Sequence, residues 1–128
     1  MKHSLGFLTI VEDAKSRVRE VTVTEYAVLR ESGASHILID VREESEWTAG
    51  HATTAVHLSK GIIERDIEAR VPDREALLVL YCGGGFRSAL AGDVLQRMGY
   101  QNVLSLAGGW RAWNEAGLPV ECPAENSH

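Results

Sequence analysis

Short apolar runs alternate along the chain with segments whose apolar residues recur at helical spacing. Two runs, at 36–41 and 77–81, are dominated by aliphatic residues and contain neither glycine nor proline, which is typical of buried strands. Weaker strand patterns lie at 18–23, 55–58 and 101–106. Apolar residues at helical spacing and turn signals predict helices over 6–16, 23–31, 43–49, 59–70, 86–98 and 110–115.

The order of these elements indicates the fold class. Strands that alternate with helices favour a parallel sheet, because each strand returns to the sheet through a helical crossover. We therefore expect an α/β fold with a central, mostly parallel sheet of about five strands and helices on both faces. The 128 residues fit a single domain with a core over about 18–120, a short helix before it, and a polar tail at 123–128 that we expect to be mobile.

Several residues mark where the predicted helices begin and end. Thr22 and Glu25 have the spacing of a capping box at the start of the 23–31 helix. Ser59 is a suitable N-cap for the 59–70 helix, and Pro72 would stop that helix.

Composition excludes several classes of function. The net charge is −5 and no dense block of Lys and Arg is present, so a nucleic-acid-binding surface is not expected. No apolar run approaches the length that spans a membrane. The apolar run from Leu5 to Val11 is followed at once by Glu12 and Asp13, without the small-residue cleavage site of a signal peptide. We expect a cytoplasmic, bacterial protein.

The two cysteines, Cys82 and Cys122, do not form a disulfide framework. Neither has His or Cys neighbours at ligand spacing, so we expect no metal site and no cofactor. Cys122 borders the polar tail without an activating neighbour, and we expect no role for it.

Cys82 has the most informative surroundings in the chain. It follows the predicted buried strand at 77–81, and the helix at 86–98 starts after Gly83, Gly84 and Gly85. The carboxyl ends of parallel strands are where ligands bind in open α/β sheets. A helix N-terminus, a glycine-rich loop and Arg87 would together stabilise a thiolate or an anion attached to it. The alternative is a buried cysteine followed by a simple turn.

Other polar residues near strand ends have two interpretations. Asp40 and Arg42 could line the pocket, but charges at a buried strand end are retained when they are paired, so we favour a structural ion pair. His51 could be a general base, although a hydrogen-bonded wall residue is the more common role. Trp110 and Trp113 share one helix face, and we assign both to the core.

Three segments, in order, resemble rhodanese-type sulfurtransferases. The segment from Cys82 to Ser88 resembles their active-site loop, and Leu106-Ala107-Gly108-Gly109-Trp110-Arg111-Ala112-Trp113 resembles their closing segment. Asp40-Val41-Arg42, Glu46-Trp47 and Gly50-His51 together resemble their first signature. The chain departs from the family pattern at Ala52 and Thr54, which bears on packing more than on chemistry. The resemblance covers about 18–120.

The resemblance implies a sulfurtransferase in which Cys82 takes sulfur from a small anionic donor such as thiosulfate and carries it as a persulfide. The acceptor would be cyanide or a thiol, either a low-molecular-weight thiol or a thioredoxin-like protein. Arg87 would orient the loop and attract the donor. The N–H groups over 83–88 would form the cradle, so we expect Gly83, Gly84, Gly85, Phe86 and Ser88 to bind substrate.

Two other functions remain open, as does a persulfide carrier that shares the chemistry but hands its sulfur to one protein partner. Cysteine phosphatases and arsenate reductases use a similar cradle, but their familiar pattern has five residues between Cys and Arg, whereas four separate Cys82 from Arg87. A non-catalytic binding or regulatory module would be expected to lack the cysteine. Nothing in the sequence requires a dimer, so we expect a monomer or a weak dimer. We expect Gly84→Val to force the cradle open and to lower activity.

Overall fold

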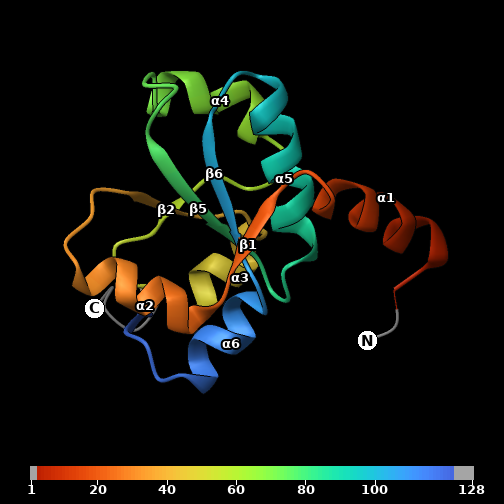
Figure 1. Ribbon diagram of the computed structural model, residues 1–128. Helices are drawn as coiled ribbons and strands as arrows, with labels where there is room; N and C mark the ends of the chain where they lie inside the picture. Colours follow the sequence, from red (N-terminus) through yellow and green to blue (C-terminus); the bar gives the residue numbers. More distant parts are fainter. Residues whose placement is uncertain (1–2, 123–128) are drawn as a thin grey trace.

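A five-stranded parallel sheet forms the centre of the protein (Figure 1), as the sequence predicts. The computed structural model describes residues 3–122, and the predicted mobile tail lies outside them. The strand order is β1-β6-β5-β2-β4, and all four pairings are parallel. The strands are β1 Arg19–Val21, β2 Ile37–Asp40, β4 Val56–His57, β5 Leu77–Tyr81 and β6 Asn102–Leu106.

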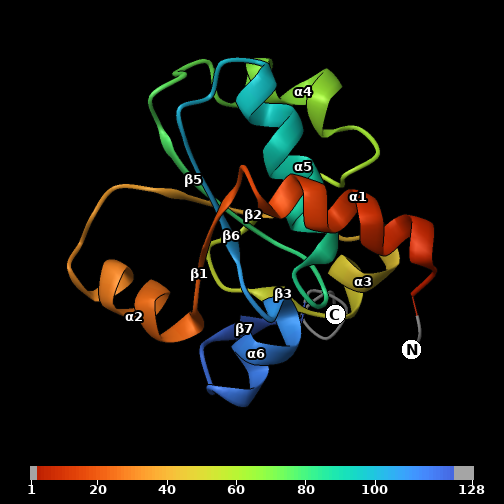
Figure 2. The ribbon, with the colours of Figure 1, turned by 45° about the vertical axis from the view of Figure 1, so that its right-hand side comes forward.

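Helices cover both faces of the sheet (Figure 2). Alternate residues of β5 point to opposite faces, so Leu78 and Leu80 pack in one apolar cluster while Val79 and Tyr81 pack in the other. The first cluster includes buried residues of α4 (Ile63–Arg70) and α5 (Phe86–Arg97). The second includes residues of α2 (Val23–Glu31) and α6 (Gly109–Glu115).

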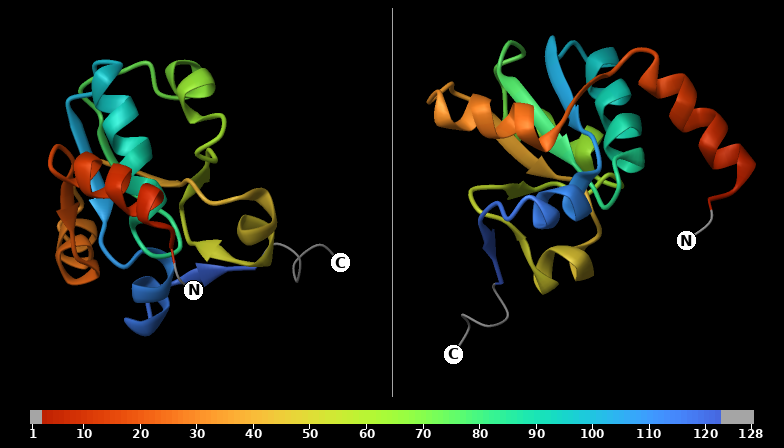
Figure 3. Two further views of the ribbon diagram at one scale, coloured as in Figure 1. Left: turned by 90° about the vertical axis from the view of Figure 1, so that its right-hand side faces the viewer. Right: turned by 60° about the horizontal axis from the view of Figure 1, so that its bottom comes forward.

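A two-stranded antiparallel sheet, β3 (His51–Ala52) with β7 (Val120–Glu121), lies beside the main one (Figure 3). The sequence does not predict this sheet, because two residues are too few to show an alternating pattern. α3 (Glu44–Ala49) comes directly before β3, so the β3–β7 pairing joins the segment after β2 to the last strand of the described residues.

One predicted helix start is wrong. Ser59 is not an N-cap, since α4 begins at Ile63 and its N-cap residue, Ile62, makes no side-chain capping bond. The segment before α4 is held beside the end of β2 instead: Leu58 N donates to Asp40 O and Lys60 N donates to Val41 O, each at 3.0 Å. Because this pairing keeps the backbone beside β2, the helix begins only at Ile63.

The capping box of α2 is confirmed. Glu25 N donates to Thr22 Oγ1 at 3.1 Å, and Thr22 N donates to the Glu25 carboxylate at 2.8 Å. Among residues 3–122, no helix is both long and apolar enough to cross a membrane.

Helix α1 (Leu5–Lys15) packs along α5, on the side away from the sheet. Its Val11 and Ala14 side chains are buried there. Just after α1, the Arg17 guanidinium donates two hydrogen bonds of 2.8 Å to the Asp93 carboxylate of α5. Those bonds hold the pKa of Asp93 below its ordinary value, mainly because they favour the charged carboxylate.

We therefore expect Asp93→Asn to lower the Tm by a few degrees at pH 7. Because the pKa of Asp93 is lower in the folded protein, its stabilisation is present above the ordinary pKa of aspartate and is lost as the pH falls through the lowered one. The Tm difference between variant and parent should thus shrink in acid. Thermal melts at pH 7 and pH 3 test this, and an undiminished difference in acid would contradict it.

Candidate active site

The Cys82 sulfur lies at the centre of the sheet's carboxyl edge and accepts hydrogen bonds from the loop that follows it. The side chain is 1% exposed. Gly85 N donates to Sγ at 3.1 Å and Ser88 N donates at 3.4 Å. Gly85 is the N-cap of α5, so both donors belong to the positive end of that helix. This arrangement favours negative charge on the sulfur atom.

A pair of buried serines lies behind the sulfur. The Ser88 hydroxyl is 3.6 Å from Cys82 Sγ and 2.7 Å from the hydroxyl of Ser105, which comes from β6. Both serines are fully buried. Ser88 thus contacts the sulfur through its amide and its hydroxyl. The sequence analysis missed Ser105, and its only signal is a serine within an otherwise aliphatic strand pattern.

The three loop glycines are not equally constrained. Gly85 has a φ of +98°, and a Cβ there would lie 3.3 Å from Gly108 N. A Cβ on Gly84 would lie 3.8 Å from the Phe86 ring, which is an ordinary contact. A Cβ alone at Gly84 would therefore not force the cradle open, whereas the expectation for the larger side chain of Gly84→Val stays a prediction. The strict requirement for glycine falls on Gly85.

The closing segment holds the loop from behind. Trp110 N donates to Cys82 O at 2.7 Å, and Arg111 N donates to Gly83 O at 3.2 Å. Gly109 has a φ of +49°, and a Cβ there would overlap the Cys82 carbonyl. In the sequence this glycine is only one member of the closing segment. The structure shows that it permits the backbone of α6 to contact the backbone of the cysteine loop.

Arg87 is paired rather than free. Its guanidinium donates to both carboxylate oxygens of Glu46, at 2.9 and 3.1 Å, across from α3. These hydrogen bonds are the main reason why the pKa of Glu46 is lowered and that of Arg87 is raised. The sequence analysis assigned Arg87 the attraction of an anion, but Glu46 offsets much of its charge. Arg87 anchors the loop to α3.

A pocket of about 740 Å³ opens in front of the sulfur. It is lined by His3, Phe7, Glu46, Cys82, Gly83, Gly84, Phe86, Arg87 and Arg111. Five of the predicted site residues are among them. Two smaller pockets, of about 420 and 380 Å³, are lined by none of the predicted site residues. Gly85 and Ser88 lie behind the sulfur instead.

The predicted Asp40–Arg42 ion pair is present and both side chains are buried. Arg42 Nη2 donates to Asp40 at 2.8 Å and to Gly50 O at 2.6 Å, and Tyr81 Oη donates to Asp40 at 2.6 Å. Burial, and next the Asp40 carboxylate, raise the pKa of Tyr81 far above its ordinary value. The residue before Cys82 is therefore a fixed, protonated donor in a structural network.

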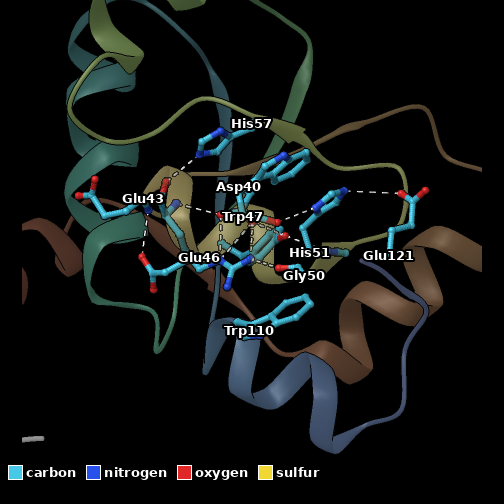
Figure 4. Close-up of polar contacts among 12 residues, drawn as sticks. Asp40, Glu43, Glu46, Trp47, Gly50, His51, His57, Trp110 and Glu121 are labelled. Atoms are coloured by element: carbon cyan, nitrogen blue, oxygen red, sulfur yellow. Dashed lines mark hydrogen bonds and ion pairs between the residues drawn. The ribbon is translucent and has the colours of Figure 1, made fainter. Parts of the chain in front are cut away.

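His51 lies in an aromatic stack, away from the pocket lining. Its ring lies 3.4 Å from the Trp47 ring, nearly parallel to it, and His57 stacks on Trp47 at 4.9 Å. His51 Nδ1 is 3.1 Å from Trp47 O and Nε2 is 3.8 Å from the Glu121 carboxylate, as Figure 4 shows. These contacts support a structural role for His51.

The two tryptophans of α6 differ in their surroundings. Trp113 is fully buried, as predicted. Trp110 is half-buried, and its ring stacks on the Arg42 guanidinium at 4.5 Å. Within the part of the chain that the structure describes, no cluster of His, Cys, Asp and Glu could hold a metal ion. Cys82 and Cys122 are both free thiols.

Comparison with known proteins finds relatives of this chain. The rhodanese-like domain model matches residues 22–116. The thiosulfate sulfurtransferase GlpE of Pseudomonas fluorescens is 32% identical over 112 residues, covering 88% of this chain and 98% of that protein. A polysulfide-sulfur transferase homodimer from Wolinella succinogenes has a TM-score of 0.78 at 28% identity, covering 96% of this chain and 92% of that one.

A further structural neighbour has another description. It is a Rhodopseudomonas palustris protein of unknown function, described as a possible tyrosine phosphatase. Its TM-score is 0.81 at 30% identity, and the match covers 94% of this chain and 98% of that one.

The contact behind the loop leads to a prediction. Gly109→Ala should lower the free energy of unfolding by about 2–4 kcal/mol, because it adds a Cβ at positive φ against the Cys82 carbonyl. In a Cys122→Ser background, iodoacetamide should also alkylate Cys82 faster. Gly84→Ala is the matched control, since its Cβ has room. Urea unfolding and alkylation rates test this, and equal behaviour of the two variants would contradict it.

Proposed function

The chain belongs to the rhodanese-like domain family, a family of sulfurtransferases, and on this basis we propose that it moves sulfane sulfur through a persulfide on Cys82. The donor would be a small anion such as thiosulfate, and the acceptor would be a thiol or cyanide. The observation that carries this proposal is the Cys82 sulfur held by the amides of Gly85 and Ser88 at a helix N-terminus.

In the first half-reaction the Cys82 thiolate attacks the outer sulfur of thiosulfate. A new S–S bond forms to Cys82, the S–S bond of thiosulfate breaks, and its electron pair leaves with sulfite. The amides of Gly85 and Ser88 already donate to Cys82 Sγ, and the first-turn amides of a helix have no partner within the helix, so further donors at the start of α5 would be available to the outer sulfur. They would stabilise the negative persulfide.

In the second half-reaction the acceptor attacks the outer sulfur and the Cys82 thiolate leaves. In the cell the acceptor would be a low-molecular-weight thiol or a thioredoxin-like protein. Since the enzyme is covalently modified between the two steps, we expect ping-pong kinetics. A monomer or weak dimer stays the proposed active form, and the Wolinella succinogenes neighbour is a homodimer.

The alternative, a cysteine phosphatase or arsenate reductase, is favoured by the description of the Rhodopseudomonas palustris neighbour. The geometry of this chain weighs against it. Arg87 follows Cys82 after four residues, and both of its terminal nitrogens are bonded to Glu46 rather than free to hold phosphate oxygens. Hydrolysis of p-nitrophenyl phosphate with no sulfur transfer from thiosulfate would favour the phosphatase.

Intact-protein mass spectrometry tests the intermediate. Reduced protein treated with thiosulfate should gain the mass of one sulfur atom and lose it again on addition of cyanide. Cys82→Ser should abolish the gain and keep the fold, since the two side chains are nearly isosteric. Cys122→Ser is the matched control and should gain sulfur like the parent. A gain that persists in Cys82→Ser, or is lost only in Cys122→Ser, would contradict the assignment.

The Arg87–Glu46 pair leads to a prediction about the KM for thiosulfate. Glu46→Gln removes the charge that offsets Arg87 while it keeps an acceptor for Glu43 N, which Glu46 Oε1 now binds at 3.0 Å. The KM for thiosulfate should fall about threefold at low ionic strength, and less at high salt, because the pair is partly exposed and screened. Glu44→Gln, on the exposed side of α3, is the control. An unchanged or raised KM would contradict this.

A further inference from the structure

The pocket in front of Cys82 has a wall that the rhodanese-like match does not include. That match begins at residue 22, whereas His3 and Phe7 come from the segment at and before α1. The two rings meet the Phe86 ring of the cysteine loop. His3 lies edge-on to Phe86 at 4.6 Å, and Phe7 lies edge-on to it at 6.3 Å. Together these three residues form an aromatic rim on one side of the pocket.

The rim is held in place by the packing of α1. Val11 and Ala14 are buried against α5, and Arg17 binds Asp93 of α5. Figures 1 and 2 show α1 running beside α5, the helix whose N-terminus carries the cysteine loop. Lys15 Nζ lies 5.1 Å from the centre of the Phe86 ring and adds a further contact. The rim therefore has a fixed position relative to the Cys82 sulfur.

The lining of the same pocket also includes a cation. Arg111 is exposed, and among residues 3–122 it forms no ion pair with an acidic side chain, while Arg87 is paired with Glu46. Its amide binds Gly83 O, which fixes its backbone beside the loop. Arg111 is thus the pocket cation whose charge remains available to an anionic substrate.

The size of the pocket bears on what it holds. At about 740 Å³ it lies within the range of about 300–1,000 Å³ that is typical of sites for organic ligands. Inorganic thiosulfate is small, dianionic and strongly hydrated, so it gains nothing from an aromatic surface. A donor with an apolar group beside its anionic group would use the rim and the cation together.

We propose that α1 is a specificity element, and that His3, Phe7 and Phe86 with Arg111 select a sulfane donor that carries an apolar organic group over inorganic thiosulfate. The inference rests on the proposed sulfur transfer. An organic thiosulfonate fits the description, since its sulfonyl oxygens would face Arg111 and its organic group would contact the rim.

The step balances as it does for thiosulfate. The Cys82 thiolate attacks the outer sulfur of the thiosulfonate, and a Cys82 persulfide forms. The bond between the outer sulfur and the sulfonyl sulfur breaks, and its electron pair leaves with the organic sulfinate. No oxidant or further reactant is needed.

The test compares benzenethiosulfonate with thiosulfate as donors, with cyanide as the common acceptor. The parent should have the higher kcat/KM with benzenethiosulfonate. Phe7→Ala should lower that value about fivefold to tenfold and change the value for thiosulfate less than twofold. Ile10→Ala, an exposed position on the same helix, is the matched control and should change neither.

A variant of Arg111 tests the contribution of the cation separately from that of the aromatic rim. Arg111→Gln should lower kcat/KM for both donors, because both are anionic, and the loss should diminish at high salt. Phe7→Leu keeps apolar volume without the ring and should retain part of the preference. Circular dichroism and Tm establish whether Phe7→Ala remains folded, and Phe7→Leu takes its place if it does not.

The outcomes separate this inference from the proposed function. Two results would overturn the inference while thiosulfate still loads Cys82 and the sulfurtransferase stands. The parent could show no preference for benzenethiosulfonate, or Phe7→Ala could lower kcat/KM equally for both donors. If neither donor loads Cys82, both are overturned. A loss confined to benzenethiosulfonate in Phe7→Ala supports the inference.

Discussion

The backbone contact between Gly109 and Cys82 is the constraint on which the site depends. It brings the amides of Trp110 and Arg111 onto the carbonyls of the cysteine loop, while the amides of Gly85 and Ser88 bind the sulfur from the other side. The backbone of the loop is therefore bonded on both sides: its carbonyls accept hydrogen bonds from α6, and the amides that follow donate to the sulfur. A loop whose carbonyls are bonded behind it presents its N–H groups forward, which is the polarity an anionic sulfur requires.

The buried polar network around Asp40 and Arg42 positions the elements on either side of the cysteine loop. Taking the Asp40–Arg42 pair out of water is costly, but the pair makes good hydrogen bonds to Tyr81 and Gly50, which limits the penalty. Tyr81 immediately precedes Cys82, so the network fixes the end of β5. Gly50 ends α3, the helix from which Glu46 reaches Arg87. A rigid path of hydrogen bonds thus joins β2, α3 and the far end of the cysteine loop.

Local patterns in the sequence predict many of the elements around the site. The aliphatic run before Cys82 gives β5, the glycines and the following periodicity give α5 at Phe86, and Thr22 with Glu25 gives a capping box. Contacts between distant segments leave no such pattern. The partners Glu46 and Arg87 are far apart in the chain, and Gly109 looks like any turn glycine. Ser59 has the right chemistry for a cap, but pairing with the end of β2 overrides it.

A rigid loop also limits how the site can discriminate between substrates. Because the loop backbone is bonded on both sides, it has little freedom to adapt to different donors, so selectivity has to come from side chains at the rim of the pocket. Two such elements adjoin it: the side chain of Arg111, whose backbone closes the loop, and α1, which packs on the helix that begins at the loop. Both can change without disturbing the amides that hold the sulfur. In the proposed function, the chemistry would thus depend on the loop backbone, and the choice of donor on the side chains around the pocket.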